Sequence, residues 1–303
     1  MLSNGEPITE ASQAYNIRAS RRLLVLCKGM SDLRSLIAPV WLAAWRGVRA
    51  VVPPAGYRTL LFHDVPPPQR PAFAALVRRL HADGRLITPA QAAAAPRPGG
   101  VLLSFDDGFQ SNLGVAETIL APLGIQALFF ICPGLTQLSG AAQAAAIAAN
   151  VFDGKRAAGD LRILDWDGVE RLKALGQEIG SHTLDHKRLT TLSPDARAEQ
   201  IEGAAQAFRQ RLGAVPDWFA YTFGDAWSVD APSLAAIAAL HRFCRSGVRG
   251  ANHDGVSPHA LRADHVELGG GDAWRWLAVE GGLDPLYRKA RAHLDGLAAG
   301  LQA

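Results

Sequence analysis

Apolar positions along the chain occur in two patterns that alternate. Short apolar runs predict strands at 58–64, 101–105, 127–132, 177–180, 242–244 and 261–268. Longer segments with helical spacing predict helices at 73–82, 116–123, 166–172 and 194–212, and from 285 onward. Ser193 precedes the 194–212 segment as an N-cap and Gly213 follows it. This alternation is typical of parallel strands with helices packed outside them, an α/β architecture.

Three regions follow from these patterns. We expect an N-terminal extension with an amphipathic helix at 1–56, a catalytic barrel at 57–270 and a helical tail packing on it at 271–303. With about seven strands, closure into a barrel is favoured over an open sheet. No GxGxxG or P-loop pattern follows a strand, which argues against a nucleotide-binding fold. The segment 90–98 is expected to be a linker, and Ser139 to Ala158 an Ala-rich helix that either walls the cleft or packs outside.

Two carboxylates end the strand at 101–105. Asp106 and Asp107 are adjacent, and adjacent carboxylates at a strand end repel each other unless a cation is present. Further along, His182 and His186 lie four residues apart, a spacing that on a helical turn lets both imidazoles reach one ion. One Asp and two His form an open ligand set of the catalytic kind. A helix cap at Asp106 and an ordinary pair of histidines are the structural alternatives.

These segments resemble a known family. Ser104-Phe105-Asp106-Asp107-Gly108 and His182-Thr183-Leu184-Asp185-His186 are similar to the first two motifs of the polysaccharide deacetylases, the NodB-homology or carbohydrate esterase family 4 domain. The resemblance covers roughly residues 57–268 and implies a distorted (β/α) barrel.

The resemblance also implies roles for individual residues. Asp106 is expected to be the catalytic base, with Asp107, His182 and His186 as ligands of one divalent metal ion. Zinc suits these ligands best, and cobalt, nickel and manganese are alternatives. In the position of the family's third motif, Tyr221, Phe223 and Gly224 are expected to bind substrate, with the Phe223 N–H stabilising an oxyanion. His63, at the end of the first strand, is a further substrate-binding candidate, although a structural role is commoner for a lone histidine.

Two departures from the family are visible. Ala220 stands where the third motif has an arginine that holds the base, and Thr222 replaces its proline. Arg262 is our candidate for replacing that arginine. The family's last motif, which carries the catalytic acid, is not recognisable. His253, His259 and His265 are the candidates, and His265 is preferred because it lies on a late predicted strand.

Composition and charge limit the function classes. The chain has 31 basic and 28 acidic residues, and this net charge of +3 gives no indication of nucleic-acid binding. The cysteines Cys27, Cys132 and Cys244 are three in number and far apart, which is typical of free thiols in a reducing compartment.

The N-terminal region shows no pattern of a secretory signal. Residues 36–45 are apolar but too short to span a bilayer, which needs about twenty. A helix packing on the barrel is the favoured interpretation. The alternative is a peripheral membrane contact through Leu36 to Val52, with Trp41, Trp45, Arg46 and Arg49 at the lipid surface. We therefore expect a cytoplasmic protein, either free or on the inner face of the membrane.

Together these observations predict a metal-dependent hydrolase that removes the N-acetyl group of an amino sugar. The expected substrate and partner is an acetylated carbohydrate, in a surface polysaccharide or its nucleotide- or lipid-linked precursor. Two alternatives stay open. One is an O-acetyl esterase or non-sugar amidase using the same metal site, and the other is an inactive carbohydrate-binding homologue. The oligomeric state is not indicated by the sequence.

Overall fold

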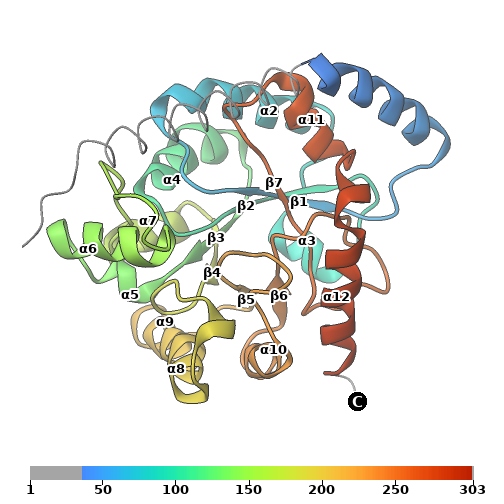
Figure 1. Cartoon of the computed structure of the whole chain (residues 1–303). Helices are drawn as coiled ribbons and strands as arrows, with labels where there is room; N and C mark the ends of the chain where they lie inside the picture. Colours follow the sequence, from blue (N-terminus) through green and yellow to red (C-terminus); the bar gives the residue numbers. More distant parts are fainter. Residues whose placement is uncertain (1–35, 302–303) are drawn as a thin grey trace, which may run out of the picture.

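Seven parallel strands form one curled sheet at the centre of the molecule. The computed structural model describes residues 36–301. The strands are β1 (Arg58–Phe62), β2 (Val101–Phe105), β3 (Leu128–Ile131), β4 (Glu178–Ser181), β5 (Trp218–Ala220), β6 (Phe243–Arg245) and β7 (Asp264–His265). Their order across the sheet is β6-β5-β4-β3-β2-β1-β7, and every pair of neighbours is parallel (Figure 1). The predicted α/β class with parallel strands is therefore confirmed.

Helices surround the sheet. They are α2 (Arg70–Ala82), α3 (Pro89–Ala94), α4 (Gln110–Val115), α5 (Pro133–Thr136), α6 (Gly140–Ala146), α7 (Trp166–Ala174), α8 (Pro194–Ala198), α9 (Ala204–Leu212), α10 (Ala231–Ala238), α11 (Asp272–Glu280) and α12 (Arg288–Ala299). A π-helical turn joins α8 to α9, so the predicted helix 194–212 is continuous, and the Ser193 side chain accepts a hydrogen bond from the N–H of Ala196. Gly213 ends it in the left-handed conformation at φ 81°.

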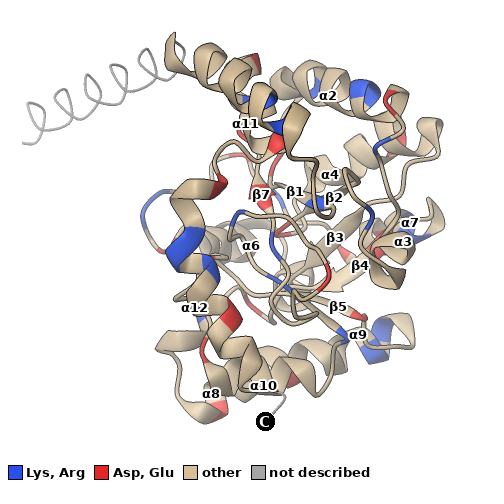
Figure 2. Ribbon diagram, turned by 90° about the vertical axis from the view of Figure 1, so that its right-hand side faces the viewer, with Lys and Arg blue, Asp and Glu red and all other residues tan. Residues whose placement is uncertain are grey.

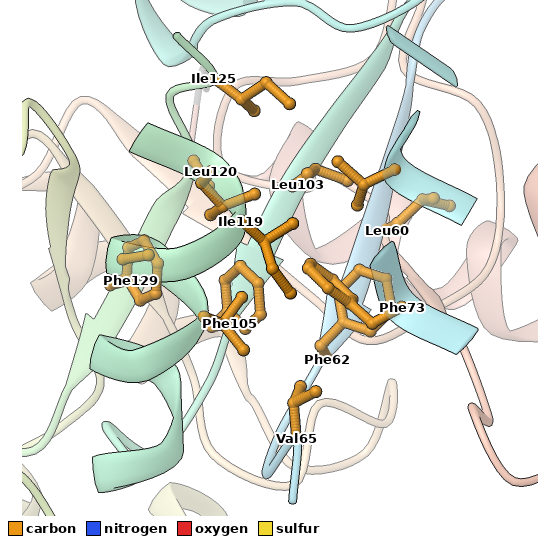
Figure 3. Close-up of a cluster of buried hydrophobic side chains, with 14 of the residues drawn as sticks. Leu60, Phe62, Val65, Phe73, Leu103, Phe105, Ile119, Leu120, Ile125 and Phe129 are labelled. Atoms are coloured by element: carbon orange, nitrogen blue, oxygen red, sulfur yellow. The ribbon is translucent and has the colours of Figure 1, made fainter. Parts of the chain in front are cut away.

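Side chains of each strand alternate between two cores. Leu103 and Phe105 of β2 point outward to α2 and α4, while Leu102 of the same strand belongs to the cluster inside the barrel. Figure 3 shows the outer cluster, in which Phe105 stacks on Phe129 of β3 with ring centroids 4.7 Å apart. Because both faces of the sheet are buried at its centre, β2 and β3 consist almost entirely of apolar residues.

The segment from residue 258 to 265 closes the sheet into a distorted barrel. Leu261 pairs in parallel with Arg245 of β6, and its N–H donates to the Cys244 carbonyl over 3.0 Å. Three residues later, β7 pairs with β1 at the opposite edge. One short segment therefore bonds to both edges, and the barrel closure predicted from the strand count is confirmed.

Several predicted boundaries are corrected by the structure. Residues 89–94 form the short helix α3 within the expected linker, with Thr88 and Gln91 making a capping box. The expected strand 261–268 contains only the two residues of β7, because the segment divides its hydrogen bonds between β6 and β1. The expected helix from Ser139 to Ala158 ends at Val151, after which the chain turns toward the cleft.

Residues 36–51 form a helix beside α11, drawn dark blue in Figure 1. Its Ala38 and Leu42 pack against Leu277 and Leu283. Within the residues described, no helix combines the length and apolar character that crossing a bilayer requires.

Candidate active site

The residues expected to act in chemistry meet at the carboxyl ends of the strands. Asp106 and Asp107 follow β2, His182 follows β4, and His63 follows β1, while His265 ends β7. All of them line a cleft of about 860 Å³. In parallel α/β barrels this end of the sheet is where loops gather side chains from several strands.

Asp107, His182 and His186 form a compact buried group. The Asp107 Oδ1 lies 3.3 Å from the His182 Nε2 and 3.1 Å from the His186 Nε2. One potential ligand atom from each of the three residues lies within 4.8 Å of the others. All three are at most 4% exposed, so the group is separated from bulk water.

Main-chain carbonyls orient both imidazoles toward the same point. The His182 Nδ1 lies 2.7 Å from the Ala220 carbonyl, and the His186 Nδ1 lies 3.1 Å from that of Asn150. Each Nδ1 therefore donates its proton outward, which presents Nε2 to the centre of the group. Metal-bound histidines are commonly held this way, because an acceptor on the other nitrogen fixes the tautomer and the ring plane.

Asp107 lacks the hydrogen bonds that a buried carboxylate requires. Its Oδ1 is fully buried and has no hydrogen-bond donor in the described part of the chain. Burial alone would raise the pKa of Asp107, but the nearby His186 and His182 outweigh it and hold that pKa well below its usual range. Burial likewise lowers the pKa of His186, and Asp107 reverses this so that the pKa is raised. An orphaned anionic oxygen between two inward-facing nitrogens fits a divalent cation.

The loops around this group adopt an unusual backbone conformation. Five non-glycine residues in the described chain have positive φ, and four of them are Asp107 (70°), Thr183 (61°), His186 (60°) and Phe223 (64°). Left-handed backbone costs about 1–3 kcal/mol per residue and is retained mainly at functional sites. The expectation that His182 and His186 share a helical turn is wrong. Two left-handed residues fold 182–186 into a loop that brings both rings to one point.

A buried arginine that the sequence analysis missed holds Asp106. The Nη2 of Arg245 makes a short ion pair with the Asp106 Oδ1, and Arg245 is 1% exposed. Its guanidinium also lies 4.7 Å from the centre of the Phe130 ring. In the sheet register, Arg245 of β6 stands beside Ala220 of β5. The arginine absent from position 220 is thus replaced from the neighbouring strand at the same level.

Arg262 does not replace the missing arginine. Its Nη2 binds both carboxylate oxygens of Asp295 on α12, at 2.8 and 2.7 Å, on the outside of the barrel. The signal for Arg245 was present in the sequence, since a charge directly follows the apolar pair Phe243-Cys244 at a predicted strand end. Whether Arg245 lies beside position 220 depends on the register of β5 and β6, which the sequence pattern does not specify.

The segment 139–158 forms one wall of the cleft. Val151, Phe152 and Arg156 line it. Asn150 supplies the carbonyl that accepts from His186, and its side-chain amide donates to the Asp185 carbonyl over 2.8 Å. Asn150 therefore fastens this wall to the histidine loop. Of the two roles considered for this segment, walling the cleft matches its position.

Among the three candidate acids, only His265 lines the cleft. Its ring centre is 5.2 Å from that of His63. His253 is half-buried and bonds to the Asp254 carbonyl, whereas the His259 Nε2 lies 3.1 Å from the His241 carbonyl. Burial, with the nearby His63 and Arg249, lowers the pKa of His265 to about 4. Its imidazole is therefore neutral at neutral pH.

Three of the four expected substrate-binding residues lie at the cleft. His63, Phe223 and Gly224 line it, and the Phe223 ring lies between the ring of His186 and the guanidinium of Arg188. Tyr221 does not reach it. Its side chain is 1% exposed within the core formed with α10 and α12, and its hydroxyl donates to the Gly224 carbonyl. Tyr221 is therefore a core residue and does not line the cleft, contrary to the expectation that it contacts substrate.

Comparison with known proteins agrees with the resemblance found in the sequence. The family model for polysaccharide deacetylase matches residues 93–241. Together with the NodB-like barrel, this match shows that the chain belongs to the polysaccharide deacetylase family, as a divergent member. Among curated proteins, no sequence matches the chain.

Solved structures share the fold at low sequence identity. IcaB from Ammonifex degensii is 22% identical, with a TM-score of 0.57 over 75% of this chain and 97% of that one. The deacetylase PplD from Streptococcus pyogenes, solved with acetate, is 18% identical, with a TM-score of 0.58 over 71% and 94% of the two chains. A de-N-acetylase from Aggregatibacter actinomycetemcomitans is 14% identical, with a TM-score of 0.55 over 73% and 99%.

We predict that the protein binds one divalent cation through Asp107, His182 and His186. Zinc or cobalt added to metal-stripped protein should bind at one ion per chain, with cobalt giving the visible absorption of a low-coordinate site. His182→Ala should lose this binding because one ligand nitrogen is removed. His253→Ala, which changes a histidine outside the cleft, is the matched control. Equal stoichiometry in wild type and His182→Ala would contradict the assignment.

Arg245→Ala should lower activity about 10²-fold or more, since it leaves Asp106 buried without a cation and free to turn away. Arg245→Lys should recover part of the activity, because a positive charge stays beside Asp106. Arg262→Ala is the control and should keep wild-type activity. Wild-type activity in Arg245→Ala would contradict the role assigned to Arg245.

The lowered pKa of His265 predicts an effect of pH on stability. The folded-state pKa of about 4 lies below the unfolded value of about 6.5, so the unfolded state binds more protons between these values. The stability tied to a neutral His265 is complete above about pH 6.5 and is lost as pH falls toward 4. Between pH 7 and pH 5, the free energy of unfolding of His265→Gln should therefore fall by about 1–2 kcal/mol less than that of wild type. Urea unfolding at the two pH values measures this difference. Equal losses would place His265 in a more hydrated setting.

Proposed function

We propose that the protein is a metal-dependent deacetylase that hydrolyses the N-acetyl group of an amino sugar. The observation that carries this proposal is the pairing of a buried Asp-His-His group with a second carboxylate, Asp106, held by Arg245 in the same cleft. Membership in the polysaccharide deacetylase family supports an acetylated carbohydrate as substrate. The products are acetate and a free amino sugar.

Asp107, His182 and His186 would hold the metal ion. When bound, the ion acts as a Lewis acid that polarises the acetyl carbonyl and makes water a better nucleophile. Zinc suits this donor set, and cobalt, nickel or manganese would also be accepted. Because Phe223 and Gly224 line the same cleft, the proposed oxyanion donor is the Phe223 N–H, held beside His186 by the left-handed conformation at Phe223.

Asp106 is proposed as the base. Arg245 fixes the orientation of the Asp106 carboxylate, which accepts a proton from the attacking water. The C–N bond then breaks, and the amine leaves with a proton. Since the His265 ring is neutral at neutral pH, Asp106 is the group that carries a proton at that stage. We assign to His265 a hydrogen bond that positions the leaving amine, together with a proton-donating role when its ring is charged.

Two other functions remain as alternatives. The same groups would cleave an O-acetyl ester or a non-sugar amide, and a free amine product distinguishes de-N-acetylation from ester hydrolysis. An inactive carbohydrate-binding homologue would bind substrate and release no acetate at any metal loading. The intact Asp106 and its buried arginine favour turnover over simple binding.

Acetate release from a panel of N-acetylated sugars, in free, nucleotide-linked and lipid-linked forms, tests the proposal. Metal-stripped wild type should be inactive and should regain activity with zinc or cobalt. Asp106→Asn should keep the metal and lose activity about 10²–10⁴-fold, because it removes the base without removing a ligand. Stoichiometric metal binding with no acetate released from any sugar would reject the deacetylase and leave the ester, amide and binding alternatives.

A further inference from the structure

Exposed apolar side chains are concentrated on one helix. Nine large apolar residues are exposed in the described chain, and seven of them lie between residues 36 and 52. They are Leu36, Ile37, Val40, Trp41, Val48, Val51 and Val52. Val40 is 72% exposed and Val51 is 82% exposed. A patch so concentrated on one element marks an interaction surface, since exposed apolar residues are otherwise scattered singly.

This helix is held firmly, so its outer face has a fixed direction. Ala38 and Leu42 pack on α11 and the turn after it, as described above. The Trp41 indole N–H donates to the Gly282 carbonyl over 2.9 Å, and that of Trp45 donates to the Glu280 carbonyl over 2.7 Å. The inner side therefore carries the polar contacts of both tryptophans, which only the alternative interpretation of the sequence placed at the lipid surface.

The outer side has almost no polar groups. Of the exposed residues between 36 and 52, Arg46 is the one charged residue, and its Nη2 pairs with Glu280 at 2.7 Å. In Figure 2 the helix that continues the grey trace is mostly tan, in contrast to α2 and α12, which carry several charges. The helix is therefore apolar on its outer side as well as on the side that packs against α11, whereas a usual surface helix is polar on its outer side.

The charge of the sequence that precedes and forms the helix indicates what would cover it. Between residues 18 and 49 the sequence contains seven basic residues, Arg18, Arg21, Arg22, Lys28, Arg34, Arg46 and Arg49, and one acidic residue, Asp32. A second copy of the chain would bring the same basic segment against this one. An anionic lipid surface supplies the opposite charge together with an apolar layer for the exposed side chains.

An apolar groove connects this helix with the catalytic cleft. The groove has a volume of about 760 Å³, and Ala38 and Pro39 of the helix are among the residues that line it. Val266, Leu268 and Trp274 are among its apolar walls. It shares the lining residues His63, Asp64 and His265 with the cleft. A substrate with a long apolar tail could therefore keep the tail in the groove while its head group reaches Asp106.

We propose that residues 36–52 dock the protein on an anionic membrane surface, where the groove receives the tail of a lipid-linked amino sugar whose acetyl group enters the cleft. The second part of this proposal rests on the proposed deacetylase function. The helix enters the lipid layer along its outer side and lies in the plane of the surface.

Vesicle binding of the full-length protein tests the docking. Wild type should sediment with phosphatidylcholine vesicles that contain phosphatidylglycerol, and less with pure phosphatidylcholine or at high salt. Val40→Glu/Val48→Glu should weaken this binding about tenfold or more, because two charges replace apolar contacts with lipid. Trp227→Glu is the matched control, since Trp227 is also 62% exposed but lies between β5 and α10. It should bind as wild type does.

Three results would overturn the docking. The first is unchanged vesicle binding by the double variant. The second is a concentration-dependent dimer that the same substitutions abolish, which would assign the face to a second copy. The third is a clearly lower melting temperature of the double variant with unchanged binding, which would show that another part of this chain covers the face.

Substrate preference tests the groove separately. Wild type should deacetylate a lipid-linked amino sugar in vesicles at least tenfold more efficiently, by kcat/KM, than a water-soluble N-acetylglucosamine oligomer. The double variant should lose this preference while keeping the rate on the soluble oligomer. Equal efficiency on both substrates by wild type would overturn the groove assignment. Absence of turnover on either substrate would instead reject the deacetylase function, and the vesicle result would still decide the docking.

Discussion

Two adjacent carboxylates lie buried at the end of β2, and each requires a positive partner to stay ionised away from water. Removing such a charge from water costs several kcal/mol unless a partner compensates. Asp106 has the guanidinium of Arg245, while Asp107 faces two imidazole nitrogens and keeps one oxygen without a donor. The left-handed residues of the surrounding loops, the main-chain contacts of the histidines and the wall that contains Asn150 all hold these partners in place.

The position of Arg245 shows how such a site tolerates change in sequence. A cation beside the base is required by charge, whereas its strand of origin is not. Positions 220 of β5 and 245 of β6 are paired in the sheet register. A side chain at either position therefore projects from the same level of the sheet. Ala220, which carries no charged side chain, still contributes to the site through its main chain, because its carbonyl orients His182.

The two sides of the cleft differ. One side is the wall formed by 139–158, and the other continues into the apolar groove that begins at His63 and His265. The helix of residues 36–51, whose tryptophans make their hydrogen bonds on its inner side, also lines that groove. If this face meets lipid, the molecule works at a surface and not on polymer free in solution.

The sequence by itself determined the parallel α/β class, because short apolar runs and helical spacing are local properties that each segment carries. It also determined the candidate ligands, since Asp106-Asp107 and the His182 to His186 spacing are themselves local. Only the tertiary structure decided that residues 182–186 form a left-handed loop, that Arg245 and not Arg262 faces Asp106, and that Tyr221 is a core residue. It also brought His265 into the cleft and left His253 and His259 outside. These outcomes depend on strand register and loop conformation, which are set by contacts between residues far apart in the chain and leave no periodic signal within any one segment.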